Sequence, residues 1–178
     1  LDSTDRETSV KLAHQRPVGT AEMEFGIDYR RKKRDITHAY FEFEAEEEDD
    51  PVVYEPDDVV SSLIEETRVD PYLMFSGDAG AMAWEAGLRY ETTDSDIGAG
   101  EGGVARDYDV LLPSLHLKWD IGEASRISLS LARSMRRPNF NHVIPALLQE
   151  EFGDNDFIGN PDLEPETANG IDVGFERR

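Results

Sequence analysis

The sequence predicts an all-β chain that forms about seven strands of an antiparallel transmembrane β-barrel. Apolar and polar residues alternate with a period of two along several segments, which places the apolar residues of a strand on one face. Short turns and long connections follow one another in strict alternation, as the periplasmic turns and extracellular loops of membrane barrels do. No apolar run approaches the roughly 20 residues of a membrane-spanning helix. Strands would therefore have to cross the membrane.

The expected strands are defined by this alternation and by the turns that bound them. The clearest one crosses residues 81–94, where apolar side chains from Met82 to Tyr90 alternate with Glu85, Arg89 and other polar or small residues. We therefore expect strands at residues 8–18, 21–35, 64–77, 81–94, 107–121, 126–138 and 166–178.

The connections between these strands fall into two length classes. The tight hairpins are expected at residues 19–20, 78–80 and 122–125. The long connections are expected at residues 36–63, 95–106 and 139–165. Pro71 and Pro113 lie inside expected strands, where each proline removes one hydrogen bond of the ladder.

Aromatic residues on the apolar face suggest two belts at the membrane interfaces. Phe75, Trp84 and Trp119 lie close to short turns, whereas Tyr29 and Tyr90 lie about one membrane crossing farther along their strands. Tyr108 has the opposite parity and is expected on the polar face. The alternative is the ordinary core of a soluble β-sandwich, which would show the same alternation.

Composition excludes several functional classes. The chain has 39 acidic and 18 basic residues, a formal net charge of -21, which argues against nucleic acid as the main partner. It has no cysteine, so disulfides and thiolate chemistry are excluded. The four histidines form no HExxH pair, and the GxGxxG-like stretch at residues 98–103 precedes a strand rather than a helix. We expect no enzymatic activity, no metal site and no cofactor.

Four motifs in register resemble one family. They are LPSL at residues 112–115, RSMRRPNF at 133–140, GNPDLEPE at 159–166 and GLRYET at 87–92. In this respect the chain is similar to TonB-dependent outer-membrane receptors, and in particular to the large receptors of the Caulobacter and Xanthomonas type.

The resemblance implies a 22-stranded barrel in the Gram-negative outer membrane, of which residues 1–178 would be the C-terminal portion. The plug domain and TonB box of the family are expected outside this chain, and we expect a missing start rather than a removed signal peptide. The family implies energy-coupled uptake of an oligosaccharide or a siderophore, with lipid, lipopolysaccharide and, through the plug, the TonB complex as partners. The alternatives are a passive porin-like or adhesin-like barrel without a plug and, third, an enzyme embedded in a barrel.

Two groups of basic residues are candidate sites. Residues at the outer end of a strand are candidates for ligand contact, with ordinary strand-end structure as the alternative: Arg136, Arg137, Asn139 and His142. A continuous basic run caps another strand, where it would bind lipopolysaccharide phosphates or form a charged rim without a specific ligand: Arg30, Arg31, Lys32, Lys33 and Arg34.

An acidic segment follows the basic run. Residues 35–66 contain thirteen acidic residues and no lysine or arginine. The sequence favours a solvated, mobile loop, and the alternative is a vestibule that attracts cations. Either form is expected to disfavour anionic ligands.

Overall fold

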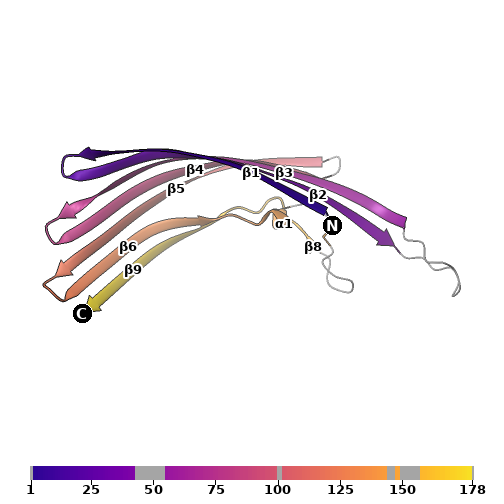
Figure 1. Ribbon diagram of the computed structural model, residues 1–178. Coiled ribbons are helices and arrows are strands. Elements are labelled where there is room, and N and C mark those ends of the chain that lie inside the picture. Colours follow the sequence, from indigo (N-terminus) through magenta and orange to yellow (C-terminus); the bar gives the residue numbers. More distant parts are fainter. Residues whose placement is uncertain (1, 43–54, 100–101, 144–146, 149–156, 178) are drawn as a thin grey trace.

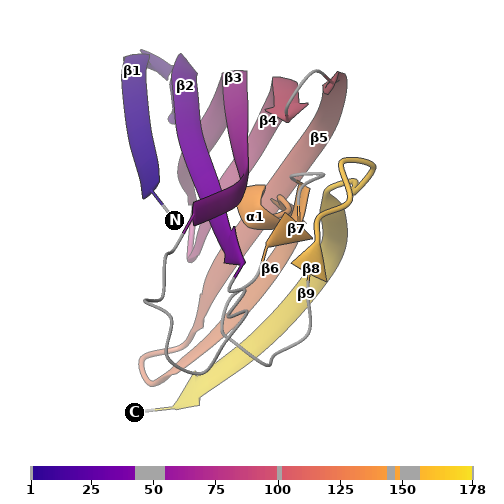
Figure 2. The ribbon, with the colours of Figure 1, turned by 90° about the vertical axis from the view of Figure 1, so that its right-hand side faces the viewer.

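One antiparallel sheet dominates the fold. The computed structural model describes residues 2–42, 55–99, 102–143, 147–148 and 157–177. Seven strands form the sheet in the order β1-β2-β3-β4-β5-β6-β9, side by side as in Figure 2. Their bounds are β1 Asp2–Val18, β2 Ala21–Glu42, β3 Glu55–Ala79, β4 Met82–Ala99, β5 Gly102–Ile121, β6 Ser125–Arg136 and β9 Glu166–Arg177. The remaining elements are helix α1 (Phe140–Val143) and a small ladder of β7 (Leu147–Leu148) with β8 (Phe157–Ile158).

The seven predicted strands are confirmed, but several extend farther than expected. β2 continues to Glu42 and β3 begins at Glu55, so much of the expected connection at residues 36–63 is paired strand. β4 and β5 pair up to Ala99 and Gly102, so the expected long connection at 95–106 is wrong and the strict alternation of loop lengths fails there. Backbone pairing needs no apolar alternation, and the ladders therefore continue beyond the alternating segments.

Three tight hairpins connect strands at one end of the sheet. At one end, the three predicted hairpins are confirmed, and each contains a glycine in the left-handed region, with φ of 63° at Gly19, 65° at Gly80 and 68° at Gly122. Glycine adopts this conformation without the steric cost that other residues meet. β6 ends at Arg136 rather than at residue 138, since Pro138 has no amide hydrogen to give to a ladder.

The sheet is curved (Figure 1). Its two faces differ in polarity. Helix α1 lies under the concave face, where Ile36, Ile64 and Ile97 of three neighbouring strands bury against Val143, with Phe140 beside them. The opposite parity forms the convex face, which no described segment covers. Its exposed large apolar side chains include Val10, Leu12, Phe25, Ile27, Tyr29, Leu73, Leu88, Tyr90, Leu111, Trp119, Ile127, Ile171, Val173 and Phe175. Such an apolar surface indicates contact with another apolar phase.

The aromatic residues follow the predicted parity. Trp119 and Phe175 are exposed on the convex face near the hairpin end, and Tyr29 and Tyr90 are exposed on it farther along. Tyr108 pairs with the buried Thr93 on the concave face, as predicted. Among the described residues, no helix is long and apolar enough to cross a membrane.

The two prolines interrupt pairing at places that shape the concave face. Pairing of β3 with β4 passes from Val69–Thr92 to Tyr72–Arg89, so Pro71 is skipped. Pro113 keeps its partner in β4, but on its other side the pairing of β5 with β6 begins only at Ser114. The half of β5 away from the hairpins, Gly102–Pro113, is therefore separate from β6. We call it the outer half of β5.

A glycine of β2 makes room for an aromatic ring. Tyr72 lies directly opposite Gly26, and its hydroxyl donates to the Glu24 carboxylate at 2.7 Å. A Cβ at position 26 would lie 2.5 Å from the Leu12 carbonyl oxygen and 2.7 Å from the Tyr72 ring.

Gly26→Ala is expected to destabilise the complete barrel by about 1 to 3 kcal/mol, because the ring and a backbone carbonyl would both have to move. Urea unfolding measures this loss. The matched control is Gly170→Ala in β9, where the nearest atom to an added Cβ is 3.8 Å away. Equal losses in the two variants would contradict the packing explanation.

Candidate functional site

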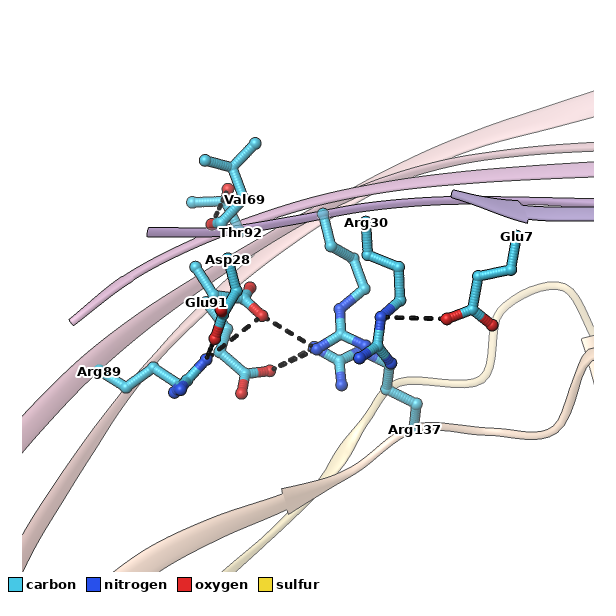
Figure 3. A network of polar contacts seen from close by, with 10 residues as sticks. Glu7, Asp28, Arg30, Val69, Arg89, Glu91, Thr92 and Arg137 are labelled. Atoms are coloured by element: carbon cyan, nitrogen blue, oxygen red, sulfur yellow. Dashed lines mark hydrogen bonds and ion pairs between the residues drawn. The ribbon is translucent and has the colours of Figure 1, made fainter. Parts of the chain in front are cut away.

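A network of ion pairs occupies the middle of the concave face (Figure 3). The register places Asp28 of β2 directly opposite Asp70 of β3, and two like charges in this position repel each other unless cations lie between them. Arg89 of β4 supplies one cation, 2.8 Å from Asp28 and 3.7 Å from Asp70. Arg68 supplies the second, 3.0 Å from Asp70.

Glu91 extends this network toward the outer end of the sheet. It lies 3.5 Å from Arg68 and accepts a hydrogen bond from Arg137. Arg137 follows the end of β6, where β5 and β6 no longer pair, and its side chain reaches the Glu91 carboxylate of β4. The side chains of Asp70 and Glu91 are only 5% and 11% exposed. Buried carboxylates of this kind require the paired guanidinium groups around them.

The segment after β6 is held against β2 by a second set of contacts. Arg34 donates two hydrogen bonds to the Asp5 carboxylate, each 2.6 Å, and a third to Asn141 at 3.0 Å. The hydrogen bonds from Arg34 hold the pKa of the Asp5 carboxyl below its usual range. The Phe140 ring lies beneath Lys32 and Arg34. The Lys32 Nζ and the Arg34 Cζ are 4.7 and 5.5 Å from the centroid of the ring. These cation–π contacts fix the two basic side chains above the ring.

A cavity of about 720 Å³ opens where these contacts meet. It is lined by Lys32, Arg34, Arg136, Arg137, Pro138, Asn139, Phe140, His142, Leu163, Glu164 and Glu166. The four residues predicted to contact a ligand, Arg136, Arg137, Asn139 and His142, thus line one cavity together. Lys32, Arg34 and Phe140 were not among the predicted ligand contacts. The alternation along β2 could have indicated Lys32 and Arg34. Tyr29 points to the convex face, so residues 30, 32 and 34 point to the concave face.

The basic run predicted to bind lipopolysaccharide is divided between the two faces. Arg31 and Lys33 lie on the convex face with Glu65, at 3.0 and 3.5 Å. The other three basic residues lie on the concave face. Arg30 is 3.3 Å from Glu7, while Lys32 and Arg34 line the cavity. The prediction treated a continuous run as one patch, whereas neighbouring residues of a strand point to opposite faces.

A second cavity of about 400 Å³ lies between the outer half of β5 and the GNPDLEPE segment. Arg106 of β5 donates a hydrogen bond to the Pro161 carbonyl and lies 3.2 Å from the Asp162 carboxylate. Glu66 of β3 also lines this cavity. The motif therefore holds β5 in place where β6 has left it.

The acidic segment is largely strand where the structure describes it. Residues 35–42 and 55–66 belong to β2 and β3, so the interpretation as a loop is wrong for them. The densest acidic run, at residues 46–50, lies outside the described residues. Within the described part of the chain, no group of three or more histidine, aspartate or glutamate side chains could hold a metal ion.

Residues 1–178 match the family model described as the outer membrane protein beta-barrel family. None of the curated proteins matches the sequence. Among solved structures, the ferric citrate transporter FecA in its unliganded form is similar, with a TM-score of 0.49 and 16% sequence identity. The match covers 75% of this chain and 20% of the FecA chain, so the chain spans about a fifth of that transporter.

Proposed function

Because the chain belongs to the outer membrane protein β-barrel family, we propose that it forms part of the wall of a large barrel that takes up a small ligand from outside the cell. The family places the chain in the cell outer membrane. A barrel wall curves around its lumen, so the concave polar face borders the lumen and the convex apolar face contacts lipid. The hairpin end is periplasmic and the cavity lies toward the outside.

The basic cavity on the lumen face is the observation that carries this proposal. Here the segment from Arg137 to Val143 returns to the sheet, and Arg137 pairs with Glu91 while Phe140 and Val143 contact the apolar cluster. A ligand entering from outside would meet this preformed cavity before the ion-pair network below it.

We further propose that uptake is energy-coupled and depends on TonB. The motifs that resemble TonB-dependent receptors support this, since each occupies a defined place in the site. LPSL contains Pro113, where β5 leaves β6; RSMRRPNF contributes the cavity lining; GNPDLEPE packs beside β5. On this proposal, the chain is the C-terminal portion of the receptor barrel, a plug fills its lumen, and the ligand is an oligosaccharide or a siderophore.

The experiment compares cells with and without the full-length receptor for uptake of radiolabelled oligosaccharides and ferric siderophores. At least one compound is expected to depend on the receptor, and its accumulation should stop when TonB is removed or the proton gradient is collapsed. Receptor-dependent uptake that continues at an unchanged rate without TonB would identify a passive porin-like barrel. No receptor-dependent compound, together with binding to a surface, would favour the adhesin-like alternative.

Lipopolysaccharide binding is expected to depend on the convex half of the basic run. Replacing Arg31 and Lys33 together by alanine should weaken lipopolysaccharide binding by the complete receptor by about 1 kcal/mol per basic residue. Titration of purified receptor with lipopolysaccharide in detergent measures the affinity. The control replaces Arg30 and Lys11, two basic residues of the concave face, and should leave the affinity unchanged. An equal loss in both double variants would mean that the face of the sheet does not matter.

A further inference from the structure

We infer that the cavity lined by Lys32, Arg34, Arg136, Arg137 and His142 binds an anionic group of the ligand, of the carboxylate, phosphate or sulfate class. This inference rests on the proposed function, because it specifies the ligand of the same site. It differs from the expectation based on the acidic segment, under which anions would be disfavoured.

Local charge is the first observation. The chain carries a formal net charge of -21, yet the cavity lining contains four cationic side chains, Lys32, Arg34, Arg136 and Arg137, against the two carboxylates of Glu164 and Glu166. The lining is thus positive by two charges, and the Asp5 and Glu91 carboxylates outside it pair with Arg34 and Arg137. The positive charge that faces a ligand therefore comes chiefly from Lys32 and Arg136. In a strongly acidic chain, a concentration of positive charge in one concavity focuses the field on an anion.

The availability of these cations is the second observation. Arg34 is engaged by Asp5 and Asn141, so the Asp5 carboxylate offsets its charge and its donors are largely used. Neither Lys32 nor Arg136 has an ion pair among the described residues. Arg137 gives one terminal nitrogen to Glu91, while its buried Nε has no hydrogen-bond partner in the described part of the chain. The Lys32 ammonium and the Arg136 guanidinium are therefore available to oxygen atoms of a ligand.

Preorganisation is the third observation. The Phe140 ring holds Lys32 at 4.7 Å, and the Glu91 carboxylate fixes Arg137 from the side of the sheet. Cations held in place before a ligand arrives lose little conformational entropy when they bind it. The lipid-facing cations Arg31 and Lys33, by contrast, each already contact Glu65. The concave set is thus the one arranged for a soluble anion.

The test uses the purified full-length receptor and calorimetric titration with three probes: inorganic pyrophosphate, tricarballylate and the uncharged maltotriose. At least one anion should bind, more weakly as salt is raised. The double variant Lys32→Gln with Arg136→Gln should weaken that binding at least tenfold. The matched control, Arg16→Gln with Arg133→Gln, removes the same charge from the opposite face and should change it less than twofold. The charge-conserving pair Lys32→Arg with Arg136→Lys should retain binding and thereby exclude misfolding as the cause.

Three results would overturn the inference: no binding of either anion at millimolar concentration, equal weakening in the concave and convex double variants, or TonB-dependent uptake of a neutral sugar that is unaffected by Lys32→Gln with Arg136→Gln. The last result would leave the proposed uptake function standing. Conversely, anion binding that follows the expected pattern in a receptor whose uptake is independent of TonB would support the site and contradict the energy coupling.

Discussion

Replacing Asp70 by asparagine is expected to lower the free energy of unfolding of the complete barrel by about 3 to 5 kcal/mol, the usual loss when one partner of a buried ion pair is removed. The Asp70 side chain is 5% exposed and lies between Arg68 at 3.0 Å and Arg89 at 3.7 Å. In the network, three carboxylates balance three guanidinium groups. Asparagine keeps the shape of the side chain but leaves one positive charge without compensation.

The control for this prediction is Asp28→Asn. Asp28 also pairs with Arg89, at 2.8 Å, but its side chain is 27% exposed, so water can solvate what the substitution leaves behind. We expect a loss of about 1 kcal/mol there, as for partly exposed ion pairs. Urea unfolding of both variants in phospholipid vesicles gives the two values. A loss at Asp70 no larger than that at Asp28 would show that burial does not govern the network.

The strands could be predicted from sequence because lipid imposes alternation on one face. From Met82 to Tyr90, every second residue of β4 belongs to the convex face, and the neighbouring strands keep the same rule. Beyond the tyrosines the rule reverses: Ile36, Ile64 and Ile97 are apolar on the concave face, where they bury under α1. This change of face breaks the periodic signal, so residues 36–42 and 95–99 resembled loops although they pair as strands.

The candidate site was predictable only in part, for a related reason. Arg136, Arg137, Asn139 and His142 are close in sequence, and the motif around them marked a strand end. Their partners Lys32 and Arg34 lie about a hundred residues earlier and join them through contacts that depend on the fold, such as Arg34 with Asn141 at 3.0 Å. Parity alone would have separated Arg31 and Lys33 from the other three basic residues of the run. No local pattern predicts that the segment after β6 returns to β2.

Leu88→Arg is expected to destabilise the complete barrel by about 2 to 4 kcal/mol, because it brings a charge to the lipid face near the middle of the membrane. Leu88 is 44% exposed on the convex face, between the aromatic residues of the hairpin end and Tyr90. A soluble β-sandwich would also be destabilised by this change, so a single variant cannot distinguish lipid from a protein core. The same substitution at another depth distinguishes the two environments, when both variants are unfolded in vesicles.

Leu63→Arg supplies that comparison, since Leu63 lies on the same face of the sheet and is 38% exposed. It lies beyond the tyrosines, level with Gly98 and opposite Asp35, where an arginine meets water and an acidic neighbour. The cost of arginine on a barrel surface falls to about 0 to 1 kcal/mol near the interface. The two variants should therefore differ by about 1 to 4 kcal/mol. Equal losses at Leu88 and Leu63 would mean that depth in the membrane is irrelevant and that the convex face does not contact lipid.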